Sequence, residues 1–355
     1  MTTKIGFIGD LHFHHKNYVE MSKALSAAVD VMLAEDVDYV VQLGDVFDHY
    51  NISTGQTSVA SIVEAVKAPL HRLWKSGRIV TYIIEGNHDQ GVVKSLGGEY
   101  QSSIDLLADE LKNIRVITNW KTLWGSDLGG VTMMCLPWKN GVTQADIDEF
   151  QKRSGKSERF TILAGHFTLE GATHFGHEIV DSEFYLTQEQ LDSFGADLNI
   201  AGHIHHRQSI YPGIIMHDSL KDSGAPTGIR ICEIDPVKRQ LISDKFVELN
   251  TPQYKLIEIE TNDTNYIKEI IAGLDNFHRY VIRVLNKRAG NIATPSNVKI
   301  EYKPPSKVTN RTGLEKEKME KMTMIDMFEL WAQRSEYDPE LISQAISKLK
   351  NSNIQ

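Results

Sequence analysis

Five short apolar runs recur along this chain, and each is followed closely by a glycine and then by Asp, Asn or His. The runs and the pairs that follow them are Lys4–Ile8 with Gly9-Asp10, Tyr39–Leu43 with Gly44-Asp45, Ile79–Ile84 with Gly86-Asn87, Phe160–Ala164 with Gly165-His166, and Leu198–Ala201 with Gly202-His203. Continuous apolar runs of this length predict β-strands that are buried on both faces. Between them, Met21–Leu33 and Ser58–Leu73 carry apolar residues at helical spacing. The pattern predicts an α/β domain whose polar side chains collect at strand ends, where ligands commonly bind in such sheets.

A change of pattern near residue 250 predicts a second, smaller unit. Tyr254–Glu260 alternates like a half-buried strand, Asn265–Leu274 has helical spacing, and two further strands are expected at Arg279–Leu285 and Val298–Tyr302. The Pro304-Pro305 pair then opens a polar run that is typical of a linker. We therefore expect a catalytic domain over 1–250, a small α+β capping domain over 251–303, a linker over 304–318 and a helical tail over 319–355.

Hydropathy and cysteine usage exclude several classes of protein. No stretch approaches 18 uninterrupted apolar residues, so we expect no transmembrane helix. The first residues run straight into a strand pattern, so we expect no signal peptide. The two cysteines, Cys135 and Cys232, exclude a disulfide scaffold and fit a reducing compartment, so we expect a cytoplasmic protein.

The polar residues at the strand ends have the composition of a divalent-metal site. They are Asp10, His12, Asp45, Asp48, Asn87, His88, His166, His203 and His205. Carboxylates, imidazoles and an amide oxygen together suit Mn²⁺, Fe²⁺ or Zn²⁺. Residues two apart in an extended segment point to the same side, so both members of Asp10-x-His12 and of His203-x-His205 can reach one cluster.

Two metals in such a site clamp a phosphate and lower the pKa of a bridging water, and they need a bridging carboxylate. Asp45 is the candidate bridge. His88, which follows the candidate ligand Asn87, is the candidate group for neutralising the leaving oxygen. Asp48 is expected to orient and polarise His88. A single strand-end Asp could equally cap a helix, but a helix cap does not explain the whole ordered set.

The ordered motifs resemble those of the calcineurin-like metallophosphoesterases. They are Gly9-Asp10-x-His12, Gly44-Asp45-x-x-Asp48, Gly86-Asn87-His88-Asp89, Gly165-His166 and Gly202-His203-x-His205. The resemblance implies a four-layer α/β/β/α fold and two divalent metal ions, with Mn²⁺ expected and Mg²⁺ as the alternative. It implies that one metal would be held by Asp10, His12, Asp45 and His205. The other would be held by Asp45, Asn87, His166 and His203, with His88 as the catalytic histidine and Asp48 as its partner.

The later part of the chain narrows the resemblance to one branch of that family. The domain order and the segments Arg207–Gly213 and Phe246–Leu249 are similar to those of SbcD-like nuclease subunits, a branch that includes phage recombination nucleases. The resemblance implies a DNA exonuclease and endonuclease acting in repair, recombination or replication. It implies an SbcC-like coiled-coil ATPase as partner, a homodimer as one possible assembly, and the host cytoplasm as the location if a phage encodes the chain.

A basic segment and the tail are the candidate contact regions for DNA and partner. Residues 278–311 hold eight Lys or Arg and one acidic residue, in a chain whose net charge is −9. Arg283, Lys287 and Arg288 are the candidate phosphate contacts, although the segment could instead be a solvated face. In the tail, apolar residues at helical spacing from Met324 to Trp331 predict a stripe that docks on a partner or folds back on the capping domain.

Two other functions remain open at this stage. A phosphomonoesterase or a cyclic-nucleotide phosphodiesterase would have the same fold, but a small-substrate enzyme has no need of residues 250–350. A non-catalytic scaffold would also have this fold, but a scaffold has no use for the leaving-group acid His88.

Overall fold

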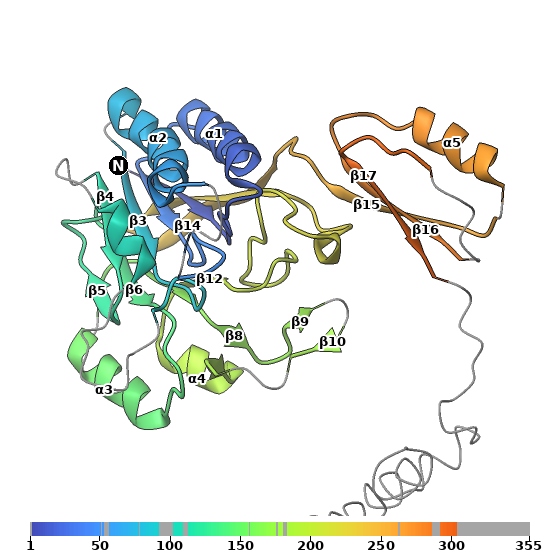
Figure 1. Cartoon of the computed structure of the whole chain (residues 1–355). Helices are drawn as coiled ribbons and strands as arrows, with labels where there is room; N and C mark the ends of the chain where they lie inside the picture. Colours follow the sequence, from blue (N-terminus) through green and yellow to red (C-terminus); the bar gives the residue numbers. More distant parts are fainter. Residues whose placement is uncertain are drawn as a thin grey trace, which may run out of the picture. The chain divides into compact units, whose positions relative to one another are not determined.

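The computed structural model describes residues 2–303 apart from 51, 53–56, 78, 92–101, 109–112, 156, 175–176, 180–182, 262 and 286–291 (Figure 1). The expected linker over 304–318 and the expected tail over 319–355 lie outside the described residues, as do Lys287 and Arg288. The chain divides into two compact units. The larger comprises residues 1–257, 273–281 and 294–299, and the described part of the smaller falls within 258–272, 282–293 and 300–303.

Two β-sheets form the centre of the larger unit. The first has six strands in the order β14 (Gln240–Glu248), β13 (Gly228–Asp235), β1 (Thr3–Ile8), β2 (Tyr39–Gln42), β3 (Val80–Ile84) and β4 (Ile114–Ile117). β1 to β4 are parallel, whereas β13 is antiparallel to both of its neighbours. The second sheet has the order β12 (Leu198–Gly202), β7 (Thr161–His166), β6 (Thr132–Leu136) and β5 (Lys121–Leu123), with β5 antiparallel to β6.

Helices cover the outer faces of the two sheets (Figure 1). The first sheet carries α1 (Tyr18–Ala34) and α2 (Val59–Gly77), and the second carries α3 (Gln144–Ser154) and α4 (Gln188–Ser193). The other elements before residue 250 are η1 (Ser103–Leu107), β8 (Thr168–Leu169), β9 (Thr173–His174), β10 (His177–Glu178), β11 (Tyr185–Leu186) and η2 (Leu220–Asp222). No helix among the described residues is long and apolar enough to cross a membrane.

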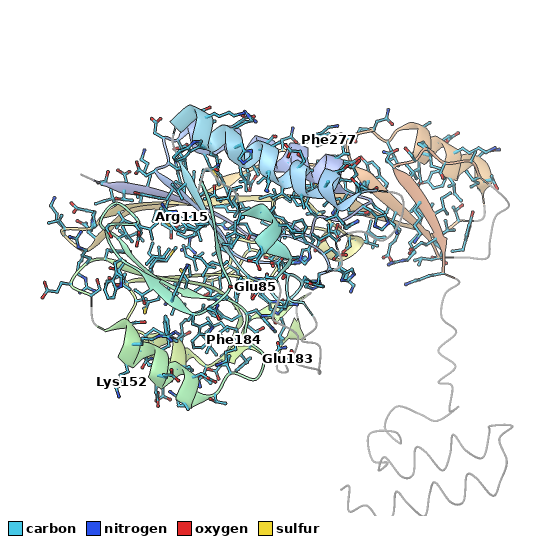
Figure 2. All side chains as sticks on the ribbon, turned by 60° about the vertical axis from the view of Figure 1, so that its left-hand side comes forward. Glu85, Arg115, Lys152, Glu183, Phe184 and Phe277 are labelled. Carbon is cyan, nitrogen blue, oxygen red and sulfur yellow. The ribbon has the colours of Figure 1, made fainter. Side chains whose placement is uncertain are left out.

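Alternation of side chains along each strand separates three apolar layers, and Figure 2 draws the side chains of the described residues. On β1, Ile5 and Phe7 pack between the two sheets, whereas Ile8 packs against α1. On β6, Met133 packs between the sheets and Met134 packs against α3. Strands buried on both faces need continuous apolar runs, which is the pattern the sequence shows. The four-layer α/β/β/α arrangement expected from the sequence is therefore confirmed.

Local sequence explains where the helices begin. Thr143 caps α3 by accepting the backbone N–H of Asp146, and the Asp146 side chain returns to the N–H of Thr143, which makes a capping box. Gly155, with φ of 64°, ends the same helix. α1 has no side-chain cap, and its buried stripe from Met21 to Met32 supplies the stabilisation instead.

The elements beyond residue 250 follow the predicted order. β15 (Tyr254–Ile259), α5 (Thr264–Ala272), β16 (Arg279–Val284) and β17 (Val298–Tyr302) succeed one another along the chain. The three strands form a sheet in the order β15-β16-β17. The predicted β-α-β-β sequence of elements is confirmed, and its assignment as a capping or DNA-binding domain stays a prediction.

Candidate metal centre

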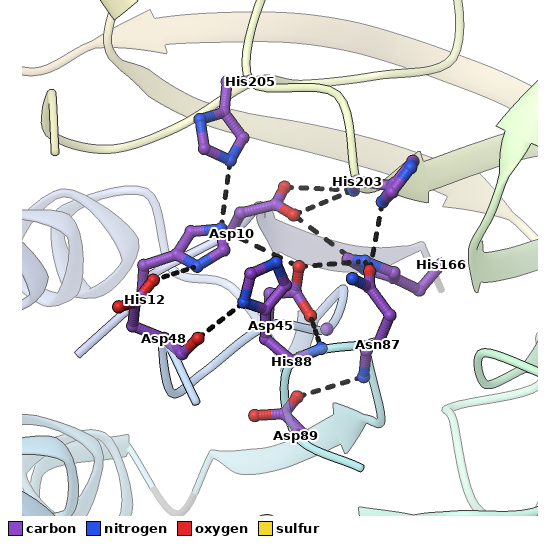
Figure 3. A network of polar contacts seen from close by, with 12 residues as sticks. Asp10, His12, Asp45, Asp48, Asn87, His88, Asp89, His166, His203 and His205 are labelled. Carbon is purple, nitrogen blue, oxygen red and sulfur yellow. Dashed lines mark hydrogen bonds and ion pairs between the residues drawn. The ribbon is translucent and has the colours of Figure 1, made fainter. Parts of the chain in front are cut away.

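The strand-end residues of both sheets converge on one site (Figure 3). From the first sheet, Asp10 and His12 follow β1, Asp45 and Asp48 follow β2, and Asn87 and His88 follow β3. From the second sheet, His166 ends β7, and His203 and His205 follow β12. Three groups have ligand atoms within 4.8 Å of one another: Asp10 with His12 and His205, His12 with Asp45 and His88, and Asp45 with His166 and His203.

Asp45 occupies the position that a bridging ligand requires. Its Oδ2 atom lies 3.2 Å from Nε2 of His166 and 3.8 Å from Nε2 of His12, so one oxygen faces both ends of the cluster. Its Oδ1 atom accepts the backbone N–H of His88 at 2.9 Å, which fixes the orientation of the carboxylate. The residue is 2 % exposed, so water offers this charge little compensation.

Buried acceptors set the tautomers of two candidate histidine ligands. The Nδ1–H of His166 donates to the carbonyl of Leu43 at 2.7 Å, which leaves Nε2 facing Asp45 and the Asn87 Oδ1 atom at 3.0 Å. The Nδ1–H of His205 donates to Asp222 at 2.8 Å, which leaves its Nε2 facing Nε2 of His12 at 3.0 Å. Two imidazole nitrogens this close need a proton or a cation between them. Histidine ligands of metals typically donate their other ring N–H to such a carbonyl or carboxylate acceptor.

The donor set fits divalent cations of hard to borderline character. It offers carboxylates, imidazole nitrogens and the Asn87 amide oxygen. Both cysteines are buried in strands outside the cluster, Cys135 on β6 and Cys232 on β13, so no thiolate joins the candidate ligands.

Protons compensate the buried carboxylates in the metal-free protein. Burial alone would lower the pKa of His12, but the contact with the Asp48 carboxylate and the charges of Asp45 and Asp10 raise it to about 10. Burial likewise opposes the charged form of His166, and Asp45 raises its pKa to about 9. Burial and the charge of His166 lower the pKa of His203 to about 3, so His203 is neutral. The cluster therefore holds positive charge at the two ends where two cations would bind.

Three candidate ligands have backbone conformations that side chains rarely adopt. His12, Asp45 and His203 have φ angles of 48°, 53° and 91°. Such strain persists only where the surroundings determine it, and it concentrates at functional sites. The preceding glycines make room for neighbouring ligands: a Cβ on Gly44 would lie 2.3 Å from Nδ1 of His166, and a Cβ on Gly86 would lie 2.1 Å from Oδ1 of Asp45.

His88 and Asp48 meet, but by a different contact from the one we expected. The Nδ1–H of His88 donates to the backbone carbonyl of Asp48 at 2.5 Å. The Asp48 carboxylate instead lies 3.6 Å from Nδ1 of His12 and 3.4 Å from Nε2 of His49. The ion pair with His12 lowers the pKa of Asp48 to about 2 despite partial burial. The buried His12 attracts the Asp48 carboxylate. Asp48 therefore positions His12 through its side chain and His88 through its main-chain carbonyl.

Sequence reasoning missed a group of supporting residues in and around η2. Asp222, 1 % exposed, accepts the Nδ1–H of His205 through Oδ1 and the backbone N–H groups of Asp218 and Ser219 through Oδ2. Asn17 donates to the carbonyl of His12 at 2.9 Å and to Asp218 at 2.7 Å. The signal available in the sequence was the Ser-x-x-Asp pattern from Ser219 to Asp222, which forms a capping box here.

Asp89 supports the loop that carries Asn87 and His88. Its buried carboxylate accepts the backbone N–H groups of Phe47 and Gly86, both at 3.0 Å, and of Val46 at 3.3 Å. Burial and the charge of Asp45 raise the pKa of Asp89 to about 7. These contacts brace the loop that carries Asn87 and His88.

A cavity of about 420 Å³ opens over the candidate ligands. Its lining includes His12, Asp45, His88 and His203 from the cluster. Among the described residues that line it, Lys221 is the one Lys or Arg, and the carboxylates of Asp48, Asp218 and Asp222 lie beside it.

Arg283, the described member of the predicted DNA-contact set, is engaged within the protein. Its guanidinium lies 2.8 Å from Glu258 and 3.6 Å from Glu301, and its side chain is 19 % exposed. Two carboxylates pair with this cation, so a DNA phosphate would compete with them for it, and the contact with DNA stays a prediction. Cross-strand neighbours on the sheet form these pairs, and spacing along the sequence does not reveal them.

Comparison with known proteins identifies the class. Residues 3–207 match the family described as calcineurin-like phosphoesterase, so the chain belongs to this family, which is a family of phosphoester hydrolases. Divalent metal ions fit the clustered His and Asp residues of this fold.

Three solved structures are similar to parts of the chain. A purple acid phosphatase from yellow lupin (Lupinus luteus) seeds has 10 % identity and a TM-score of 0.41, and the match covers 70 % of this chain and 54 % of the lupin chain. A dimetal phosphatase from Danio rerio has 14 % identity and a TM-score of 0.37, with 69 % and 98 % covered. The anchor in the inner membrane complex of Plasmodium has 12 % identity and a TM-score of 0.40, with 82 % and 99 % covered. The chain thus spans about half the length of the lupin phosphatase.

Proposed function

We propose that this protein is a DNA exonuclease and endonuclease that hydrolyses phosphodiester bonds with two divalent metal ions, Mn²⁺ being the expected metal and Mg²⁺ the alternative. The observation that carries the proposal is the joint placement of Asp45 and His88. Asp45 faces both ends of the ligand cluster, and His88 lies beside it in the open cavity. This is the arrangement that in-line displacement at phosphorus requires.

The charges around the cavity favour a diester over a monoester. A phosphomonoester carries more negative charge than a diester near neutral pH, so it needs more positive charge from the protein. The described lining offers Lys221 together with the carboxylates of Asp48, Asp218 and Asp222. A monoanionic phosphodiester is repelled less by such a lining.

Each candidate residue has a defined task. Asp10, His12, Asp45 and His205 would hold one metal, and Asp45, Asn87, His166 and His203 the other. The metal pair, when bound, supplies positive charge that polarises the phosphate and lowers the pKa of the attacking water.

His88 supplies the proton that the leaving group needs. Its Nδ1–H is held by the Asp48 carbonyl, which orients Nε2. His88 donates a proton from Nε2 to the leaving 3′ oxygen as the P–O bond breaks. Asp48 keeps His88 and His12 in place.

The same family and ligand set also suit a phosphomonoesterase or a cyclic-nucleotide phosphodiesterase, which are the alternative functions. The deciding assay uses the full-length protein on single- and double-stranded DNA with Mn²⁺ or Mg²⁺, alongside p-nitrophenyl phosphate and bis(p-nitrophenyl) phosphate. The expected result is metal-dependent cleavage of DNA and of the diester. Hydrolysis of the monoester without any cleavage of DNA would refute the nuclease and favour a phosphatase.

We further propose that the protein acts with an SbcC-like coiled-coil ATPase on DNA in the cytoplasm, and a homodimer is one possible assembly. The proposal rests on the sequence resemblance and on the apolar stripe expected within 319–355, which lies outside the described residues. Deleting 319–355 should abolish co-purification with the ATPase and leave Mn²⁺-dependent cleavage by the isolated chain intact. A truncated chain that still forms the complex at full affinity would refute docking through this segment.

A further inference from the structure

A second cavity, of about 610 Å³, opens at the same edge of the sheets as the candidate metal centre. Its lining comes from the loops after β3, β4 and β6 and from α3. We call it the Trp120 cavity. Its volume lies within the range of roughly 300–1,000 Å³ that small-molecule sites occupy. The function proposed above assigns it no role.

A row of aromatic rings connects the Trp120 cavity to the metal centre. Trp120 stacks on Phe184 (labelled in Figure 2) with a centroid separation of 5.5 Å and an interplanar angle of 24°. Phe184 meets the edge of Trp138 at 5.9 Å, and Trp138 lies 5.0 Å from the ring of His203. Trp138 lines the Trp120 cavity, and its ring is next to that of His203, a candidate metal ligand. A ligand in the cavity would therefore lie one indole ring away from His203.

Trp120 is held in place by its neighbours, and the Lys139 ammonium lies over its ring, 5.6 Å from the centroid, so a base that stacks on Trp120 would displace this ammonium. Its indole N–H donates to the carbonyl of Pro137 at 3.0 Å, and the edge of Phe150 packs against it at 5.5 Å. The ring is half-buried and lines the cavity. A fixed aromatic ring in a cavity is the usual platform on which a nucleobase stacks.

The polar groups of the cavity suit a neutral planar ligand. Two cationic side chains, Lys139 and Arg153, line it with the carboxyl groups of Glu85, Asp146 and Glu149. Lys139 is paired with Asp146, and Arg153 donates to the carbonyl of Trp120. Positive charge is therefore not in excess, which disfavours a phosphate group. The lining also holds Asn119 and Asn140, whose amides both donate and accept hydrogen bonds as the edges of bases do.

We propose that the Trp120 cavity receives the nucleobase of a nucleotide next to the scissile phosphate, with Trp120 as its stacking surface. The proposal rests on the proposed phosphodiesterase function and extends it to substrate recognition. Every base can stack on an aromatic ring, so stacking does not depend on the nucleotide sequence. The cavity would therefore select nucleotides over other phosphodiesters without selecting one base.

The test compares diesters that share a leaving group and differ in the base. The full-length protein with Mn²⁺ hydrolyses thymidine 5′- and 3′-(p-nitrophenyl phosphate) and methyl p-nitrophenyl phosphate. We expect a higher kcat/KM for at least one thymidine ester than for the methyl ester. Trp120→Leu should reduce that preference by roughly 10- to 100-fold, the range of one base stacking on an aromatic ring. Trp120→Phe should retain most of it.

The matched control is Trp124→Leu. Trp124 is an exposed tryptophan that directly follows β5, whereas Trp120 directly precedes it, and Trp124 lines a different cavity. This variant should leave the preference and the methyl ester rate unchanged. Trp120 also packs on Phe184, so melting temperatures are compared. Saturation-transfer NMR of the wild-type chain with thymidine 5′-monophosphate gives a readout that needs no variant, and its base protons should receive the strongest saturation.

The outcomes separate the two proposals. If the wild type hydrolyses the methyl and thymidine esters equally and the base protons receive no saturation, the base site is refuted and the phosphodiesterase stands. If no diester is hydrolysed but the base protons are saturated, and Trp120→Leu removes that signal, the base site stands and the proposed hydrolysis is wrong.

Discussion

The Nδ1–H of His205 donates to the buried carboxylate of Asp222 over 2.8 Å. The other oxygen of Asp222 accepts two backbone N–H groups and the Ser219 hydroxyl. One carboxylate therefore fixes a candidate metal ligand and the turn beside it. The bond determines which nitrogen of His205 faces the cluster, so Asp222 acts on the metal through His205.

Asp222→Asn should weaken binding of one Mn²⁺ by about 10- to 100-fold. The backbone N–H groups need an acceptor, so the Asn oxygen will face them and its NH₂ will face His205. Nδ1 of His205 then becomes an acceptor and Nε2 carries the proton, which blocks Nε2 as a ligand. Calorimetric titration measures the affinity, and ¹⁵N NMR of the histidines reports the tautomer. Asp244→Ala on the edge strand β14, where Asp244 pairs with Arg230, is the control. Wild-type affinity in Asp222→Asn would contradict the assignment.

Metal binding should release protons at neutral pH. In the metal-free protein the pKa of His12 is raised to about 10 and that of His166 to about 9, so both rings are protonated at pH 7.5. Ligands must be neutral to bind a metal, so about two protons leave on full loading and affinity rises with pH. Titrations in buffers of different ionisation enthalpy count the protons.

The same shifts predict the pH dependence of the metal-free fold. A raised pKa stabilises the folded state below the unfolded value of about 6.5, and this stabilisation is lost as pH rises through the folded value. The melting temperature without metal should therefore fall between about pH 7 and pH 10. A buffer-independent heat of metal binding at pH 7.5 would show that both histidines are already neutral.

His88→Ala should lose about 10²- to 10⁴-fold in the rate of DNA cleavage while metal affinity stays near wild type. His88 donates to the Asp48 carbonyl and lines the cavity, and we assign it to the proton transfer and not to metal binding. Asp45→Ala should instead lose metal, because the bridging carboxylate is removed.

His49→Ala is the matched control for His88→Ala. The His49 ring stacks on that of His88 at 5.9 Å, but the His49 side chain is 71 % exposed. The rate of DNA cleavage should therefore fall far less in His49→Ala than in His88→Ala. Near-normal cleavage by His88→Ala would contradict the catalytic assignment. Loss of metal in the same variant would place His88 among the ligands.

The fold of the larger unit and the predicted cluster follow from local patterns. Apolar runs predict doubly buried strands wherever two sheets are stacked, and a glycine before a polar residue marks a close approach, as at Gly44 and Gly86. The antiparallel strands β13 and β14 were not predicted, because polar residues interrupt the apolar residues of β13 and because β14 is largely exposed. In the folded chain the nine predicted strand-end residues lie close together (Figure 3), and their catalytic roles stay predictions.

Long-range contacts account for what local patterns missed. Asp222 reaches His205 only because η2 folds back over the end of β12. A carboxylate has several possible partners, and burial decides among them: Asp48 faces the buried His12 and leaves its main chain to His88. The positive charge of Arg283 is evident from the sequence, whereas its ion pairs with Glu258 and Glu301 are evident only once the strands are placed side by side in the sheet.

These ion pairs divide the basic segment into residues with different expected effects. Arg283→Ala should leave the salt dependence of DNA binding unchanged, because its charge is already compensated by Glu258 and Glu301. Lys287→Ala with Arg288→Ala should lower the slope of log K against log[salt] by about 0.7–0.9 for each lost phosphate contact. Fluorescence anisotropy on labelled DNA over a salt series measures the slopes. Hydrolysis of bis(p-nitrophenyl) phosphate should be unchanged in all variants, since this small diester lacks the neighbouring phosphates that these residues are proposed to contact. A slope that falls in Arg283→Ala would show that DNA displaces the two carboxylates, and an unchanged slope in the double variant would assign Lys287 and Arg288 to a solvated face.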